Sequence, residues 1–185
     1  MIGKAEAARR ELVRIKGEQS GQGRVILAVD PGTAATGICL LRDGAPQWIQ
    51  VVRVLGDGAE ARLPVMCSNV ARIVHNGLAD GADTLAIEWQ AIRPTDKRPN
   101  DILNLGIVIG AALAPERPSW CRLLTPLPVQ WKGSNKADFF TKHMKARYPA
   151  AADQMHGVPE YLQHNGYDAL GLAVWAINQA LPWRV

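Results

Sequence analysis

The sequence predicts an α/β protein with a mixed five-stranded sheet and helices on both faces. Two uniformly apolar runs, residues 25–29 and 84–87, are typical of strands that are covered on both sides. Three β patterns come first and βα units follow them. This order predicts a three-stranded antiparallel meander beside two parallel strands.

The 185-residue chain is long enough for one domain with a sizeable core. Residues 4–17 have apolar side chains at helical spacing, and residues 20–23 read as a flexible Gly- and Ser-containing joint. We therefore expect a basic helical extension over residues 1–23 and a main domain over residues 24–185.

The main domain is expected to open with the meander, as strands over 24–30, 36–42 and about 47–55. Pro31-Gly32 ends the first strand, and Asp43-Gly44 is a strong hairpin signal between the second and the third.

The βα units follow, with a helix predicted over 58–77, a strand over 84–88 and a polar loop over 91–100. The next helix, 101–114, is apolar almost all round, which indicates burial against the core or a second chain. The remaining predicted elements are a strand over 120–125, a helix over 135–147 that Asn135 caps, and a final helix over 165–180.

The composition favours a cytoplasmic protein. No apolar run reaches the roughly 20 residues that a membrane span needs, and the polar N-terminus lacks the apolar centre of a secretory signal. Cys39, Cys67 and Cys121 are odd in number and widely spaced, which indicates reduced core residues.

Positive charge is concentrated in two segments. The net charge is +4, and residues 1–24 supply +3 of it, with six basic and three acidic side chains. Residues 132–147 are also locally basic. A polyanionic partner would explain both segments, although solvated helix faces give the same pattern.

Three carboxylates interrupt apolar surroundings. Asp30 and Glu88 end the two apolar runs, and Asp168 lies near the start of the final helix. Such carboxylates cost free energy on burial unless they are paired or bind a metal ion. If the two apolar strands are parallel neighbours, Asp30 and Glu88 lie at the same edge of the sheet, where ligands bind.

Converging carboxylates are the hard oxygen ligands of divalent cations. Two Mg²⁺ ions about 3.5–4 Å apart activate water and stabilise the leaving oxygen in phosphodiester hydrolysis. Asp30 and Glu88 also have structural alternatives, as a turn former and as the partner of a core Arg or Lys. His164, four residues before Asp168 and expected on the same helix face, could likewise be a surface helix cap. Their joint occurrence favours the metal site.

The same residues resemble the motifs of RuvC-type Holliday junction resolvases in the RNase H-like superfamily. The matching segments are Asp30–Gly37 (DPGTAATG), Ala86–Gln90, Leu105–Ala112 and Asp168–Ala173. The resemblance covers about residues 24–180. It implies an RNase H-like fold and a homodimer, formed through helix 101–114, that nicks four-way DNA junctions symmetrically. The compact chain and its extension suggest a phage or mobile-element version.

The resemblance also implies that Asp30, Glu88 and Asp168 are catalytic carboxylates that bind two Mg²⁺ or Mn²⁺ ions. The family usually has a fourth acidic or His ligand one helical turn before the last Asp. His164 is favoured for that place, with Asn165 in reserve.

Nucleic-acid contacts are expected at the basic and aromatic residues around the carboxylates. Lys132 and Lys136 lie where the family carries basic residues near the scissile phosphate. Where the family often has a wedge aromatic, this chain has Ala91, with Trp89 just before it. The full predicted set is Lys132, Lys136, Arg93, Lys97, Arg98 and Trp89.

Three rival functions remain. A nuclease of the same fold that acts on flaps, forks or RNA–DNA hybrids would use identical chemistry. The Asp30–Gly37 turn also resembles the phosphate loop of sugar-kinase and actin-like ATPases, but those need two such domains and a second Gly-rich loop. A non-catalytic nucleic-acid-binding module is disfavoured by the three intact carboxylates.

Overall fold

The computed structural model describes residues 23–90, 99–133 and 137–179. The predicted helix over 4–17 and most of the predicted extension over 1–23 lie outside the described residues, as do Arg93, Lys97, Arg98 and Lys136. The described elements are β1 (Val25–Asp30), β2 (Ala35–Arg42), β3 (Ala45–Arg53), α2 (Gly58–Ala79), β4 (Thr84–Ile87), α3 (Pro99–Leu113), β5 (Arg122–Leu124), α4 (Pro128–Trp131), α5 (Ala137–Arg147), α6 (Ala151–Gln154) and α7 (Glu160–Gln179).

The predicted mixed sheet is confirmed. The strand order is β3-β2-β1-β4-β5, in which β1, β2 and β3 pair antiparallel and β1, β4 and β5 pair parallel. Asp43 and Gly44 both have positive φ angles, of 52° and 80°, as the hairpin turn between β2 and β3 requires.

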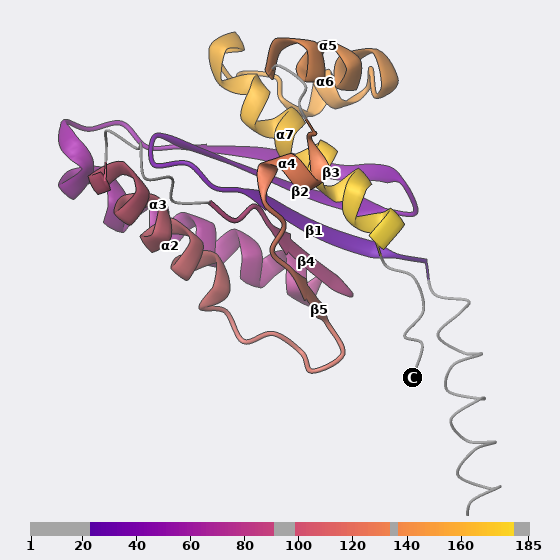
Figure 1. The fold of residues 1–185 in the computed structure, drawn as a ribbon, viewed down its shortest axis with the longest axis horizontal. Coiled ribbons are helices and arrows are strands. Elements are labelled where there is room, and N and C mark those ends of the chain that lie inside the picture. The colour runs from indigo at the N-terminus through magenta and orange to yellow at the C-terminus, as the bar shows by residue number, and fades with distance from the viewer. Residues whose placement is uncertain (1–22, 91–98, 134–136, 180–185) are drawn as a thin grey trace, which may run out of the picture.

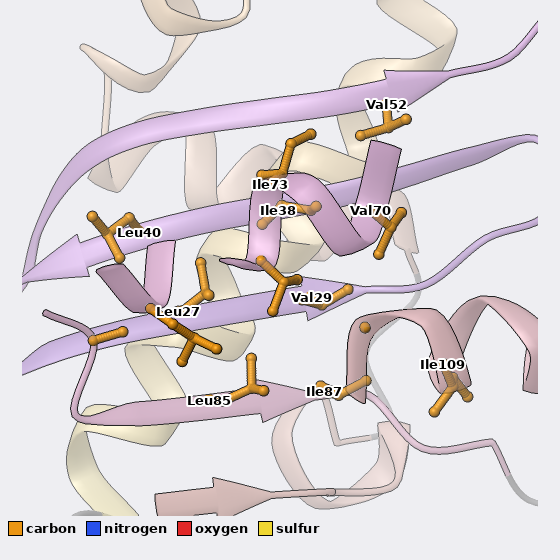
Figure 2. Close-up of a cluster of buried hydrophobic side chains, with 14 of the residues drawn as sticks. Leu27, Val29, Ile38, Leu40, Val52, Val70, Ile73, Leu85, Ile87 and Ile109 are labelled. Atoms are coloured by element: carbon orange, nitrogen blue, oxygen red, sulfur yellow. The ribbon is translucent and has the colours of Figure 1, made fainter. Parts of the chain in front are cut away.

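Helices cover both faces of the sheet (Figure 1). Helices α2 and α3 lie on one face, and α7 crosses the other face with α4, α5 and α6 around it. Figure 2 shows the core on the α2 side, where Leu27, Val29, Ile38 and Ile87 of the central strands pack against Val70 and other helix residues. Strands β1 and β4 are therefore buried on both faces, as their unbroken apolar sequences predict.

Helix α7 begins at Glu160, five residues earlier than predicted. Pro159 precedes it, and its carbonyl oxygen accepts a hydrogen bond from the Leu162 N–H at 2.8 Å. The prediction took Asn165 as the start, but the Asn165 side chain donates to the Leu162 carbonyl oxygen from within the helix, at 3.1 Å. The earlier start brings His164 onto the helix, one turn before Asp168.

Two short helices, α4 and α6, were not predicted. Each has four residues, too few for a periodic apolar pattern. Pro128 opens α4, as is common at a first helical position, and the Gln130 side chain accepts a hydrogen bond from the Leu127 N–H at 2.6 Å.

Helix α3 is buried against the core on one side, and its other apolar side is exposed in the single chain. Val108, Ile109 and Ala112 are buried in the core shared with α2, whereas Leu103 and Ile107 are 66% and 52% exposed. We call Leu103, Ile107, Gly110 and Leu113, all exposed, the outer face of α3.

Two further sequence expectations concern the cysteines and the membrane. Cys39 and Cys121 are buried free thiols as expected, while Cys67 is only partly buried at the rim of the core. Within the described residues, no helix combines the length and the apolar character that crossing a bilayer would require.

Candidate active site

The site lies where the two central parallel strands end. Val29 of β1 pairs with Ile87 of β4, so Asp30 and Glu88 leave the sheet side by side. The Glu88 N–H donates to the carbonyl oxygen of Val29 at 3.0 Å, which ties the start of the loop after β4 to β1. The predicted neighbourhood of these two carboxylates is present in the structure.

The turn after Asp30 is held by Thr36, which is fully buried. Its hydroxyl donates to the Gly32 carbonyl oxygen at 2.9 Å and accepts from the Gly32 N–H at 3.2 Å. A Cβ atom at Gly32 would overlap the carbonyl oxygen of Ala35, so this turn needs glycine for close backbone approach.

Asp168 reaches the site because α7 lies directly on β2. Gly37 is the partner of Asp30 across the β1–β2 pair, and a Cβ atom there would overlap the Asn165 carbonyl oxygen. At Gly171 an added Cβ would overlap the Phe140 ring. These glycines place the Asp168 turn of α7 against the sheet and against the layer of α4 and α5.

Glu88 is 7% exposed, and both of its carboxylate oxygens accept hydrogen bonds. The Trp131 indole N–H donates to Oε2 at 2.9 Å, and the Gln90 amide donates to Oε1 at 2.8 Å. Neither partner is among the residues predicted for the site. A signal existed for Gln90, which lies in the quoted 86–90 segment, but Trp131 comes from the unpredicted helix α4.

Lys132 brings positive charge into the carboxylate cluster. Its Nζ lies 2.6 Å from Asp168 Oδ2, in an ion pair that is largely withdrawn from solvent. It also lies 5.5 Å from the centre of the Trp131 ring and 5.1 Å from that of Phe140, within cation–π range. Lys132 was predicted to contact nucleic acid, and the structure places it in the cluster itself.

The pKa values of all three acids are raised, and at Asp30 and Glu88 neighbouring carboxylate charges contribute to the shift. Burial raises the pKa of Asp30 well above its ordinary value, and the charges of Glu88 and Asp168 raise it further, while Lys132 opposes them. Burial is also the main cause of the raised pKa of Glu88 and of Asp168; Asp168 adds to the shift of Glu88, and the Trp131 and Lys132 contacts counteract these shifts. One lysine does not neutralise three carboxylates.

The residues fit a divalent cation in their chemistry. Asp168 Oδ1 is buried and has no hydrogen-bond partner in the described part of the chain, which is costly for a carboxylate oxygen. Such an oxygen, in a cluster of hard donors with surplus negative charge, suits Mg²⁺ or Mn²⁺. Within the described ranges, no group of three or more Asp, Glu, His or Cys side chains is arranged so that it could hold a metal ion.

The two candidates for the fourth position share the first turns of α7. His164 is exposed, and its Nδ1 lies 2.8 Å from the Tyr161 carbonyl oxygen; a proton on Nδ1 makes this a hydrogen bond and leaves Nε2 as an acceptor. Metal-binding histidines commonly donate their other nitrogen in this way. When both of its ring nitrogens carry a proton, the charge of His164 also lowers the pKa of Asp168. Asn165 has its amide nitrogen engaged with Leu162.

Trp89 follows Glu88 directly and is 43% exposed. Its backbone N–H donates to the Pro126 carbonyl oxygen at 2.8 Å, which anchors the start of the loop beside the α4 segment. An exposed indole next to the carboxylates suits its predicted role in DNA contact.

We expect the metal-free protein to lose stability as the pH rises. The pKa values of these acids are raised in the folded state. At pH values between the ordinary carboxyl pKa and the raised ones, the folded state therefore binds more protons than the unfolded chain. The free energy of unfolding falls as the pH rises through that range. Asp30→Asn removes one repelling charge. In a chelator, thermal unfolding should show a higher Tm for this variant, with a larger gain at pH 8 than at pH 5.

The matched control is Asp153→Asn, which removes an exposed carboxylate on α6 and should leave the Tm nearly unchanged at both pH values. An Asp30→Asn protein with a Tm at pH 8 equal to or below that of the wild type would contradict the charge-repulsion account.

Comparisons with known proteins identify the fold. No family model and no curated protein sequence matches the chain. Solved structures do match: Thermus thermophilus RuvC in complex with a Holliday junction substrate gives a TM-score of 0.58 at 18% identity, covering 85% of this chain and 94% of that one. A second T. thermophilus RuvC structure gives 0.56 at 17% identity, covering 84% and 95%.

The yeast mitochondrial Holliday junction resolvase Ydc2 gives a TM-score of 0.52 at 11% identity, covering 84% of this chain and 82% of that one. At these identities the likeness establishes the architecture. The chain has the RNase H-like fold of RuvC-type resolvases, as the sequence motifs implied.

Proposed function

We propose that this chain is a divalent-metal-dependent endonuclease that resolves four-way DNA junctions by paired phosphodiester cleavage. The observation that carries the proposal is the meeting of Asp30, Glu88 and Asp168 at the end of β1 and β4, with an unpartnered, buried oxygen on Asp168. The fold shared with resolvases adds independent support.

The metal ligands would be Asp30, Glu88, Asp168 and His164, with Asn165 as the alternative to His164. Two bound Mg²⁺ or Mn²⁺ ions would supply an activated water and charge stabilisation at the leaving oxygen. The protein's own contribution is to hold the ligands in place: Trp131 and Gln90 orient the two oxygens of Glu88, and the carbonyl of Tyr161 orients His164.

Lys132 would bind the scissile phosphate, the group on which the metal ions act. It is anchored by Asp168 and flanked by the rings of Trp131 and Phe140, which limits its motion. A fixed ammonium group beside the carboxylates would attract the scissile phosphate into a site that otherwise repels anions. Exposed Trp89, on the adjoining loop, would contact the neighbouring nucleotides.

The substrate class is the part of the proposal that a direct assay tests best. A nuclease for flaps, forks or RNA–DNA hybrids would have the same carboxylates. We therefore expect cleavage of a synthetic four-way junction in Mg²⁺ or Mn²⁺ at fixed salt, with weaker cleavage of a flap, a fork and a hybrid. If one of the other three substrates is cleaved as fast as the junction or faster, the protein is a nuclease for that class of substrate.

Paired cleavage requires two active sites, and the outer face of α3 is the proposed homodimer contact. Its exposed Leu103, Ile107 and Leu113 form an apolar surface, and a Cβ atom at Gly106 or Gly110 would meet nothing within 4 Å. Small residues on an apolar helix face allow two helices to pack closely, so a second copy of this chain fits the surface.

We expect Gly110→Arg to convert the dimer to a folded monomer in analytical ultracentrifugation, because it places a charge in the middle of the apolar contact. Within one chain the position is open, so the monomer fold should be kept. Gly110→Ala is the control: it improves helix propensity by about 1 kcal/mol and should leave the dimer intact. A folded Gly110→Arg dimer would show that the contact lies elsewhere.

A further inference from the structure

A cleft lies at the same edge of the sheet as the carboxylates. It has a volume of about 200 Å³ and is lined mainly by Arg53, Leu55 and Arg62 from the β3–α2 region, and by Ala34, Tyr161 and Leu162. Pockets for whole cofactors usually have roughly 300–1,000 Å³. This cleft therefore suits a smaller unit, such as one nucleotide of a longer strand.

The cleft presents positive charge that no residue in the described part of the chain neutralises. Within the described residues neither Arg53 nor Arg62 forms an ion pair. The Arg62 Nε is buried and has no hydrogen-bond partner there. Asp57, Glu60 and Glu160 are nearby in the sequence, but none of them lines the cleft. A buried guanidinium nitrogen without a partner indicates an anionic ligand, and guanidinium geometry matches phosphate.

The cleft also presents a stacking surface. Tyr161 is 65% exposed, and the Arg53 guanidinium lies 5.9 Å from the centre of its ring. Leu55, 74% exposed, extends the apolar surface beside it. An aromatic ring next to arginines is the arrangement that holds an unpaired base while the arginines hold its phosphate. A base inside an intact duplex is already stacked on its neighbours.

The cleft lies within a few nucleotides of the proposed cleavage point. Asp30 of β1 pairs with Gly37 of β2, and Arg53 of β3 pairs with Ala35, two residues before Gly37. By ordinary strand spacings, Arg53 therefore lies roughly 12 Å from Asp30. Tyr161 precedes Asp168 by seven residues on α7, or about 10 Å of helix. Either span equals about three of the steps by which a duplex rises per nucleotide along its axis.

We propose that this cleft binds one unpaired nucleotide of the DNA strand that enters the active site, with the base on Tyr161 and the phosphate at Arg62 and Arg53. The proposal rests on the proposed function, since it assigns the cleft to the substrate of the same site. It would make the enzyme sensitive to strand separation near the cut, in addition to the charge of the DNA backbone.

The test is fluorescence anisotropy of the full-length, metal-free protein with a labelled single-stranded dT12 oligonucleotide and with a blunt duplex. Tyr161→Ala should weaken dT12 binding about tenfold and duplex binding less than twofold. Tyr161→Phe should restore dT12 binding, because it keeps the ring. On an abasic oligonucleotide of the same length, Tyr161→Ala should have no effect.

Arg62→Gln should weaken dT12 binding about fivefold and lower the slope of log affinity against log salt by roughly one phosphate contact. The control is Arg72→Gln, which removes the same charge from an exposed position about 15 Å further along α2 and should bind dT12 as the wild type does.

Wild-type dT12 affinity in both Tyr161→Ala and Arg62→Gln would overturn the proposal. So would equal losses on duplex and single strand, which would mean unspecific phosphate contact. The measurement needs no cleavage. If the protein cuts no junction but Tyr161→Ala weakens dT12 binding, the cleft proposal holds and the proposed nuclease function is refuted. If the protein cuts the junction and Tyr161→Ala has no effect on dT12 binding, the nuclease function holds and the cleft proposal is refuted.

Discussion

Asp30→Asn is expected to abolish junction cleavage while leaving junction binding nearly intact. Asp30 ends β1 between Glu88 and Asp168, where burial and then the charges of these two acids raise its pKa, so its carboxylate is the most central of the three. Loss of a metal ligand removes several kcal/mol of transition-state stabilisation, which corresponds to at least about 10³-fold in rate. Single-turnover cleavage of a labelled four-way junction measures it.

Binding by the same variant separates chemistry from recognition. Asn has nearly the same shape as Asp, and the variant removes a charge that repels phosphate, so the junction affinity in a chelator should be equal or slightly higher. Asp153→Asn, on the exposed surface of α6, should cleave at the wild-type rate. Cleavage by Asp30→Asn at the wild-type rate would show that Asp30 is not a catalytic metal ligand.

Gly37→Ala is expected to impair both the fold and the site. The added Cβ would overlap the backbone oxygen of Asn165, so α7 has to move away from β2. Overpacking of this kind costs about 1–3 kcal/mol of unfolding free energy. Asp168 follows Asn165 by three residues, and a displacement of about 1 Å in a catalytic group costs roughly 10²-fold in rate.

A matched variant tests whether the loss comes from the position of the helix. Gly166→Ala adds the same methyl group one residue further along α7 from Asn165, but its Cβ would meet side chains, above all the Met155 sulfur and then methyl groups of Ile49 and Val51, and no backbone atom of the sheet. It should retain more activity than Gly37→Ala at a temperature where thermal unfolding shows both to be folded. Equal cleavage by Gly37→Ala and the wild type would show that the glycine does not set the place of Asp168.

The sheet and the proximity of Asp30 and Glu88 follow from simple sequence patterns. Unbroken apolar strands had to be central, and a carboxylate at the end of each had to meet the other if the strands ran parallel. Asp168 was different. Nothing in its local pattern showed that α7 crosses β2 at Gly37, so its place came from the family resemblance, and the structure supplies the physical reason in close glycine packing.

The contact of Trp131 and the position of Lys132 could not be predicted in the same way. Trp131 reaches Glu88 from a four-residue helix, across 43 residues of sequence, and short helices leave no periodic signal. The sequence predicts only a DNA contact for Lys132, because sequence distance hides its ion pair with Asp168, 36 residues away. Contacts of this kind depend on tertiary packing.

The most direct test of the central claim is the pattern of cuts in a four-way junction whose four strands are each end-labelled. With wild-type protein in Mg²⁺ or Mn²⁺, the account predicts nicks at the same position in two opposing strands near the branch point, and none in a linear duplex of the same sequence. An uncut junction in both metals, or cuts spread over all four strands and the duplex alike, would contradict it.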